Sequence, residues 1–200
     1  MCYNYGVVIN METQKAKPLN IAELLRKKDG RTNWSAVGKK SKNKGNRYEA
    51  LIAKQLNTWY YYEESQRLGA QVLRRTPLSG GWCKTGDVMI DPRFSKEVPD
   101  FPFQAEMKRH ENWHLEHLLT SDKCLFRAEW WPKLCEEADA VEKRPLLVFA
   151  MNAVSSMCAY RIEGPMNFNA PVMDIYLPGE TIRVVPFAAF LTLPKGTFPP

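Results

Sequence analysis

One segment limits the possible folds of this chain more than any other, the near-continuous apolar run PLLVFAM at Pro145–Met151. A strand with one solvated face alternates apolar and polar residues, whereas a strand covered on both faces is apolar throughout. The run therefore predicts a central strand with a layer of structure on each side. Further runs of strand character precede it at Ala70–Arg75, Asp87–Ile90 and Pro102–Lys108.

Two segments have the spacing of helices that bury one face. Apolar and aromatic residues recur at three- and four-residue intervals from Tyr48 to Trp59, which predicts a helix over about 45–67 that ends near Gly69. A second helix is expected over about 123–142. Pro132 lies inside it and leaves open whether the stretch forms one helix or two pieces.

The carboxyl-terminal part is rich in strand-like runs. Met157–Ile162 and Asp174–Leu177 are expected to be strands, and the apolar stretch Ile182–Leu193 is expected to pack on the core. The order along the chain is therefore helix, three strands, helix, strand and a β-rich end. This order predicts an α/β or α+β domain built around a mixed central sheet with flanking helices.

Residues 1–43 differ in character and are interpreted as a basic extension that precedes a folded domain over 44–200. The segment Ile21–Lys28 can form two turns of amphipathic helix. The stretch KKSKNKGN at 39–46 is expected to be a polar linker.

The chain has a formal net charge of +6, and basic residues gather between Lys15 and Arg47. A basic block of this kind binds a polyanion by releasing condensed counterions. It is equally typical of a solvated tail that keeps a protein soluble. The charge alone thus suggests nucleic acid as a partner without deciding for it.

Other features bear on the location of the chain. No run approaches the ~18 apolar residues of a membrane helix, and Met1–Asn10 lacks the pattern of a secretory signal. The five cysteines are odd in number and show no CxxC spacing, so reduced thiols are expected. We therefore predict a cytoplasmic protein without membrane contact.

A carboxylate and an amine occur together in the third expected strand. Side chains alternate between faces along a strand, so Glu106 and Lys108 would point the same way and Met107 into the opposite layer. Such a pair can hydrolyse a phosphodiester, because the carboxylate binds a hard cation and the amine orients or helps to deprotonate water. A surface Glu-x-Lys pair is far more often a simple ion pair.

Asp87 supports a catalytic interpretation of the pair Glu106 and Lys108. It follows Gly86 at the start of the preceding strand, a position where an acid is otherwise most often a turn residue or a cap. Neighbouring strands can bring Asp87 and Glu106 together, and two clustered carboxylates repel unless a cation lies between them. Mg²⁺ fits best because it prefers oxygen ligands and keeps waters that can attack phosphorus.

Four short motifs follow one another along the chain: KGNRYE at Lys44–Glu49, RTPLSGG at Arg75–Gly81, GDV at Gly86–Val88 and EMK at Glu106–Lys108. Their order resembles the PD-(D/E)XK nuclease superfamily, and most of all the archaeal Holliday-junction resolvases and related phage nucleases. The PD dipeptide itself is absent, since Thr85-Gly86 precedes Asp87. The insert between Asp87 and Glu106 is also longer than a tight hairpin.

The resemblance implies a restriction-endonuclease-like core of the order α-β-β-β-α-β with a β-rich C-terminal extension, and metal-dependent hydrolysis of DNA phosphodiesters. Glu49, Asp87 and Glu106 would bind Mg²⁺ together with the backbone carbonyl of Met107, and Mn²⁺ would substitute. Lys108 would assist the attacking water, so Glu49, Asp87, Glu106 and Lys108 are the expected catalytic residues. The family further implies a homodimer that cleaves duplex or branched DNA.

Rival functions remain open beside this one. The same fold serves in restriction and repair nucleases without junction preference. A non-catalytic DNA-binding module would need none of the four expected catalytic residues. A structural or interaction protein would carry the same charges as surface ion pairs.

Several other polar residues are candidates for contacts with DNA phosphates. Arginine can hold a phosphate with two hydrogen bonds, and glycine beside serine allows close approach of the backbone. Exposed strand-end charges and an ordinary loop are the alternatives. The expected DNA-binding residues are Lys44, Arg47, Arg74, Arg75, Ser79, Arg109 and His110.

Histidines and aromatic residues give weaker signals. His110, His114, His117 and Cys124 suggest zinc, but their spacing matches no familiar zinc module, and contact of this stretch with DNA is the preferred interpretation. Trp130 and Trp131 resemble a binding platform but are expected to pack in or around the core. The run Trp59–Tyr62 is expected to pack on a helix surface, with a dimer interface as an alternative.

Overall fold

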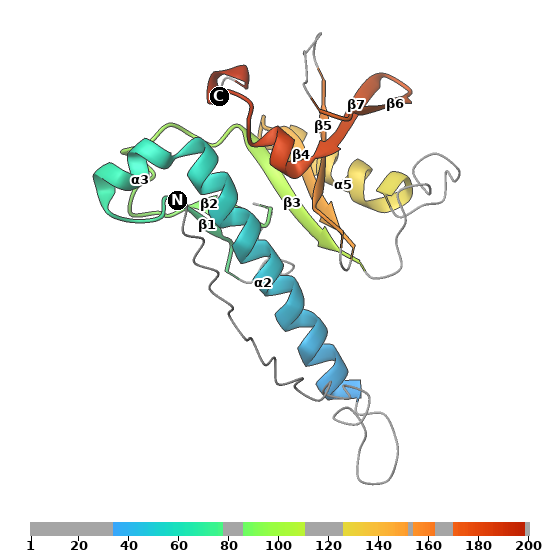
Figure 1. Ribbon diagram of the computed structural model, residues 1–200, viewed down its shortest axis with the longest axis horizontal. Coiled ribbons are helices and arrows are strands. Elements are labelled where there is room, and N and C mark those ends of the chain that lie inside the picture. Colours follow the sequence, from blue (N-terminus) through green and yellow to red (C-terminus); the bar gives the residue numbers. More distant parts are fainter. Residues whose placement is uncertain (1–33, 78–85, 111–125, 152–153, 163–169, 199–200) are drawn as a thin grey trace, which may run out of the picture. The chain divides into compact units, whose positions relative to one another are not determined.

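The computed structural model of the chain describes residues 34–77, 86–110, 126–151, 154–162 and 170–198 (Figure 1). The chain divides into two compact units, Met1–Ser41 and Lys42–Pro200. Apart from the first turns of one helix, everything below belongs to the second unit. None of the helices in these ranges is long and apolar enough to cross a membrane.

Helices α2 (Trp34–Tyr60) and α3 (Tyr62–Leu68) stand where a single helix over 45–67 was predicted. The chain bends at Tyr61, whose side chain is fully buried and donates a hydrogen bond from its hydroxyl to the carbonyl of Pro99 at 2.7 Å. Tyr60 is also buried, so the prediction that this aromatic run packs on a helix surface is wrong for both residues. Helix α3 ends at Gly69, as predicted, in a left-handed conformation with φ 62°.

The stretch at 39–46 is helical, and the prediction of a linker there is wrong. Lysine is a good helix former, no proline interrupts the stretch, and a glycine in a helix costs only on the order of 1 kcal/mol. Polarity alone therefore did not mark the end of the helix. The buried residues of α2 all lie from Tyr48 onward, so the core holds only the second half of this helix.

Five strands form one mixed sheet in the order β3-β4-β5-β7-β6 (Figure 1). The pair β3 and β4 is parallel and the other three pairs are antiparallel, which agrees with the predicted mixed sheet. The strands after residue 155 thus continue the central sheet. The bounds are β3 Phe103–Arg109, β4 Arg144–Ala150, β5 Met157–Arg161, β6 Met173–Leu177 and β7 Glu180–Pro186.

Strand β4 is buried on both faces, as its apolar sequence predicted. Leu146 and Val148 belong to a core cluster shared with α2, whereas Leu147 and Phe149 belong to a second cluster shared with α5. The sheet therefore separates two apolar layers. The first layer also includes α6 (Phe187–Phe190) and Phe198, which follows the short 3-10 helix η2 (Lys195–Thr197).

The second predicted helix is divided into two pieces. A π-helical turn, η1 (Phe126–Trp130), leads directly into α5 (Trp131–Asp139), and Pro132 lies in the first turn of α5. Proline is tolerated there because the first amides of a helix have no partner within it. Trp130 and Trp131 are buried, as predicted for core packing. Cys135 and Cys158 are free and buried.

The first two strands, β1 (Leu73–Arg75) and β2 (Val88–Ile90), form a separate antiparallel ladder in the described part of the chain. Backbone hydrogen bonds extend this ladder by one step at each end, from Thr76 N to Asp87 O and from Asp91 N to Val72 O. One further bond, from Asp87 N to Ala105 O at 2.9 Å, ties the ladder to β3. Asp87 therefore lies where the ladder meets the central sheet.

Candidate active site

Asp87 is held against β3 by two hydrogen bonds. Its amide donates to the carbonyl of Ala105, and its Oδ2 accepts from the amide of Met107 at 2.7 Å. Gly86 allows this close approach, because it has φ 66° and a Cβ at this position would lie 2.7 Å from Ala105 O. The Gly-Asp pair therefore places a carboxylate, 7% exposed, at the strand that bears Glu106.

Glu106 and Lys108 share one face of β3, as predicted. Met107 between them is 5% exposed and packs in the cluster with α2, whereas Glu106 and Lys108 are only half-buried. Lys108 Nζ donates a hydrogen bond to Glu106 Oε1 at 2.5 Å. The pair lines a small pocket with Trp130 of η1 and Lys133 of α5.

Glu49 reaches the site from α2 and is paired with an arginine. Arg75 Nε lies 2.5 Å from Glu49 Oε2, and Arg75 Nη2 donates to Asn46 Oδ1 at 2.9 Å. Asn46 lies three residues before Glu49, so both face the same side of the helix. Arg75, expected to contact DNA, is thus in contact with two residues of α2 in this structure.

The electrostatics of Asp87 connect all four residues. Burial raises its pKa to about 7, with further increases from the charges of Glu106 and Glu49, opposed by the Met107 amide and Lys108. Burial alone would lower the pKa of Lys108, but Glu106, Asp87 and Glu129 together raise it. The site therefore holds an aspartate whose charged form is disfavoured by burial and by two neighbouring glutamates, beside a lysine whose pKa is raised.

This set of donors suits a hard divalent cation. Carboxylate oxygens are the ligands that Mg²⁺ prefers, and a cation would relieve the repulsion that raises the pKa of Asp87. As they stand, no three His, Cys, Asp or Glu side chains among the described residues are grouped to hold a metal. Glu49 and Glu106 instead contact Arg75 and Lys108, so a bound cation would share these carboxylates with the two basic side chains or replace them.

Two contributors were missing from the sequence-based expectation. Asn46 could have been found, since it lies one helical turn before Glu49 and inside the first motif. Glu129, whose charge acts on the pKa of Lys108, gave no signal because the π-helical turn that carries it shifts the helical register.

The remaining residues expected to contact DNA are dispersed. Lys44 and Arg47 lie on α2, and Arg47 is exposed. Arg109 and His110 are exposed at the end of β3, with Arg109 over the ring of Tyr48 at 5.8 Å and His110 6.1 Å from the ring of Trp130. Arg74 lies on β1 beside Asp91.

Several predictions fall outside the described residues. These are the proposed phosphate contact of Ser79, the helix at Ile21–Lys28, and the histidine and cysteine positions 114, 117 and 124 of the zinc alternative. His110, the one histidine that the structure describes, is exposed and near Trp130.

Comparisons with known proteins give one result. Neither the curated proteins nor the solved structures contain a match to the chain. Residues 40–175 match the family described as "Phage putative PDDEXK endonuclease". That range contains α2 from Lys40 onward, β1 to β5, and all four residues gathered around Asp87. The chain therefore belongs to the phage PDDEXK endonuclease family.

Proposed function

We propose that this chain is a Mg²⁺-dependent endodeoxyribonuclease whose catalytic residues are Glu49, Asp87, Glu106 and Lys108. The observation that carries the proposal is the arrangement around Asp87 in a member of an endonuclease family: its carboxylate is hydrogen-bonded to the strand that bears Glu106 and Lys108, and the charge of Glu49 acts on it. A purely structural ion-pair cluster would not need a buried aspartate whose pKa is raised to about 7.

Each residue has a distinct part in the proposed mechanism. Asp87 and Glu106 would hold the cation, with the Met107 carbonyl and Glu49 as further ligands. When bound, Mg²⁺ would neutralise charge on the scissile phosphate and polarise a water. Lys108 would orient the attacking water or help to deprotonate it. Mn²⁺ would substitute for Mg²⁺.

The substrate that we propose is a branched or duplex DNA processed during recombination or phage genome handling. The order of the motifs resembles that of Holliday-junction resolvases, and this resemblance supports branched DNA. A homodimer would place two sites on the two strands of such a substrate.

A second candidate is a non-catalytic DNA-binding module on the same fold. The pairing of Glu49 with Arg75 and of Glu106 with Lys108 favours it, because those pairs satisfy the carboxylates without a metal. Such a module would bind DNA equally well with and without Mg²⁺.

The test compares wild type with Asp87→Asn and Lys108→Ala on a labelled four-way junction and a matched linear duplex, in Mg²⁺ or EDTA. Glu136→Gln, at an exposed position of α5, is the matched control. We expect Mg²⁺-dependent cleavage that both site variants reduce at least about 100-fold and the control leaves unchanged.

The outcomes separate the candidates. Symmetric nicks at the junction would support a resolvase, and equal cleavage of both substrates would leave a nuclease without junction preference. Binding of both substrates with no cleavage under any condition would favour the binding module.

A further inference from the structure

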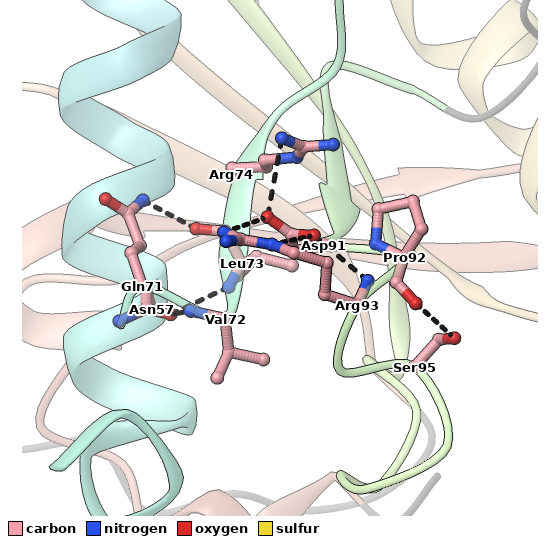
Figure 2. A network of polar contacts seen from close by, with 9 residues as sticks. All are labelled: Asn57, Gln71, Val72, Leu73, Arg74, Asp91, Pro92, Arg93 and Ser95. Carbon is pink, nitrogen blue, oxygen red and sulfur yellow. Dashed lines mark hydrogen bonds and ion pairs between the residues drawn. The ribbon is translucent and has the colours of Figure 1, made fainter. Parts of the chain in front are cut away.

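A second polar cluster lies at the other end of the β1–β2 ladder, around Asp91 (Figure 2). Asp91 is 2% exposed, and its carboxylate meets two arginines. Arg93 donates to it from Nε at 3.1 Å, from Nη2 at 2.9 Å and from its amide at 3.0 Å. Arg74 Nη1 lies 3.4 Å from Asp91 Oδ2. The hydrogen bonds from Arg93, with help from Arg74, lower the pKa of Asp91 to about 2, so the cluster carries one negative and two positive charges.

Both arginines keep part of their hydrogen-bonding capacity. The side chain of Arg93 is 70% exposed and that of Arg74 43% exposed. A guanidinium has five N–H donors, and the described contacts of Arg93 use two of them. Arg74 Nε has no partner within the described residues but is buried, so any contact of Arg74 with an anion uses the exposed part of its guanidinium. The two cations therefore present a net positive surface that can donate to an anion.

A backbone hydrogen bond and an aromatic ring hold the cluster in position. Asp91 N donates to Val72 O at 2.8 Å, which holds the aspartate in the ladder, and the Arg93 guanidinium lies over the ring of Phe94 at 5.1 Å. The buried carboxylate of Asp91 needs a positively charged partner in the folded protein, and Arg93 alone supplies one. Arg74 adds a second positive charge beside a carboxylate that Arg93 already pairs, and a guanidinium can bind a phosphate with two N–H groups.

The ladder relates this cluster to the candidate active site. Asp87 and Asp91 flank β2, and four residues of extended strand span about 13 Å. Along duplex DNA, at about 3.4 Å per base pair, this corresponds to roughly four base-pair steps. Arg74 is paired with Met89 across the ladder, midway between the two aspartates.

We propose that Arg74 and Arg93, positioned by the buried carboxylate of Asp91, bind a backbone phosphate of the DNA roughly four steps away from the phosphate that is cut. This inference rests on the proposed function, because it requires DNA to occupy the site at Asp87. Arg74 and Arg93 are binding residues in it, and Asp91 is a positioning residue. Contacts with the phosphate backbone add affinity without sequence preference.

The first test measures DNA binding by the full chain in EDTA, where no cleavage occurs. A labelled duplex is titrated with wild type, Arg93→Ala, Arg74→Ala and the control Arg67→Ala, from about 50 to about 200 mM salt. Arg67, on α3, is also an exposed arginine beside a carboxylate, that of Glu97. We expect Arg93→Ala and Arg74→Ala each to weaken DNA binding about 10-fold. The slope of log affinity against log salt concentration should fall by about one for each of them, and the control should change neither quantity.

The second test locates the phosphate. Duplexes that carry a single neutral methylphosphonate at successive positions are bound to wild type and to Arg93→Ala. We expect one position, about three to five steps from the cut, where the modification weakens binding by wild type and has no further effect on the variant. Arg93→Ala removes two hydrogen bonds from the buried carboxylate of Asp91, so thermal unfolding of each variant is measured first and binding is compared only at temperatures where both proteins are folded.

Each outcome bears on one of the two proposals. If wild type cleaves DNA but Arg74→Ala and Arg93→Ala bind it like the Arg67→Ala control, the phosphate contact of the two arginines is overturned and the proposed nuclease function is kept. If wild type neither binds nor cleaves DNA, both are overturned. A methylphosphonate effect that persists in Arg93→Ala would show that other residues hold that phosphate.

Discussion

Gly86 shows how one backbone position determines where the candidate catalytic aspartate lies. Replacement by alanine would place a Cβ 2.7 Å from Ala105 O in a residue with φ 66°. We expect Gly86→Ala to lower the free energy of unfolding by about 2–4 kcal/mol, from left-handed strain and a backbone shift, and to abolish cleavage. Urea denaturation and a cleavage assay measure the two effects.

Gly179 offers the matched control for this substitution. It also has a positive φ, 86°, but a Cβ added there would meet no atom within 4 Å. Gly179→Ala should cost only about 1–2 kcal/mol and keep activity. Equal losses of activity in the two variants would contradict the role of Gly86 in placing Asp87.

Asp87 also makes the stability of the metal-free protein depend on pH. Its pKa in the folded protein is about 7, above the ordinary value of 3.8. Between these values the folded state keeps a proton that the unfolded chain has lost, so this group lowers stability as pH rises through that interval. In EDTA, Asp87→Asn should be more stable than wild type by about 1–3 kcal/mol at pH 8 and about equal near pH 4.

Denaturant unfolding of both proteins across this pH range measures the difference. Titrating groups that do not interact with Asp87 contribute equally to both curves and therefore cancel in the difference. Added Mg²⁺ should stabilise wild type at pH 8 and leave Asp87→Asn unaffected. A gap between the two proteins that stays constant with pH would contradict the assignment.

At the scale of elements, the sequence predicted those parts of the fold that local pattern determines. The apolar run of β4 marked a strand buried on both faces, and the alternation in β3 placed Glu106 and Lys108 together. The bend at Tyr61 was not predicted, because it depends on packing with residues far away in the sequence, such as Pro99. The helical stretch at 39–46 was not predicted, because its many lysines were interpreted as a polar linker although lysine is a good helix former. The pairing of Glu49 with Arg75 was also hidden, since it joins residues that meet only in the folded chain.

Asn57 links α2 to the ladder that carries Asp87. Its Oδ1 accepts hydrogen bonds from the amides of Val72 at 2.9 Å and Leu73 at 2.7 Å, as Figure 2 shows, and its side chain is 6% exposed. Asn57→Ala would leave two buried amides without an acceptor. We expect a loss of about 2–5 kcal/mol in unfolding free energy and a matching loss of cleavage, measured by urea denaturation and an activity assay.

Ser65 provides the control for this prediction. Asn57 Nδ2 donates to Ser65 Oγ at 2.9 Å, so Ser65→Ala removes a partner of the same amide without touching the ladder. That variant should lose at most about 1 kcal/mol and remain active. A comparable loss of unfolding free energy in both variants would mean that Asn57 stabilises the fold through its contact with α3 and not through its link to the ladder.

At the scale of the whole molecule, the residues of the apolar core and the basic residues of positions 1–33 occupy different parts of the sequence. The two apolar clusters of the described residues lie between Tyr48 and Phe198. Residues 1–33 lie outside the described ranges and carry six basic residues: Lys15, Lys17, Arg26, Lys27, Lys28 and Arg31. If residues 1–33 serve DNA binding, the charge of these six side chains adds affinity that falls with rising salt.

Deletion of residues 1–33 should therefore change the two properties differently. We expect the free energy of unfolding to stay within about 0.5 kcal/mol, because every member of the two apolar clusters found among the described residues remains in the shortened chain. Affinity for DNA should fall, with a shallower dependence on salt, while cleavage at saturating protein persists. A full-length variant with the same six basic residues changed to glutamine should match the deletion in both measurements. If the glutamine variant binds like wild type and the deletion does not, the contribution of the extension comes from its structure and not from its charge.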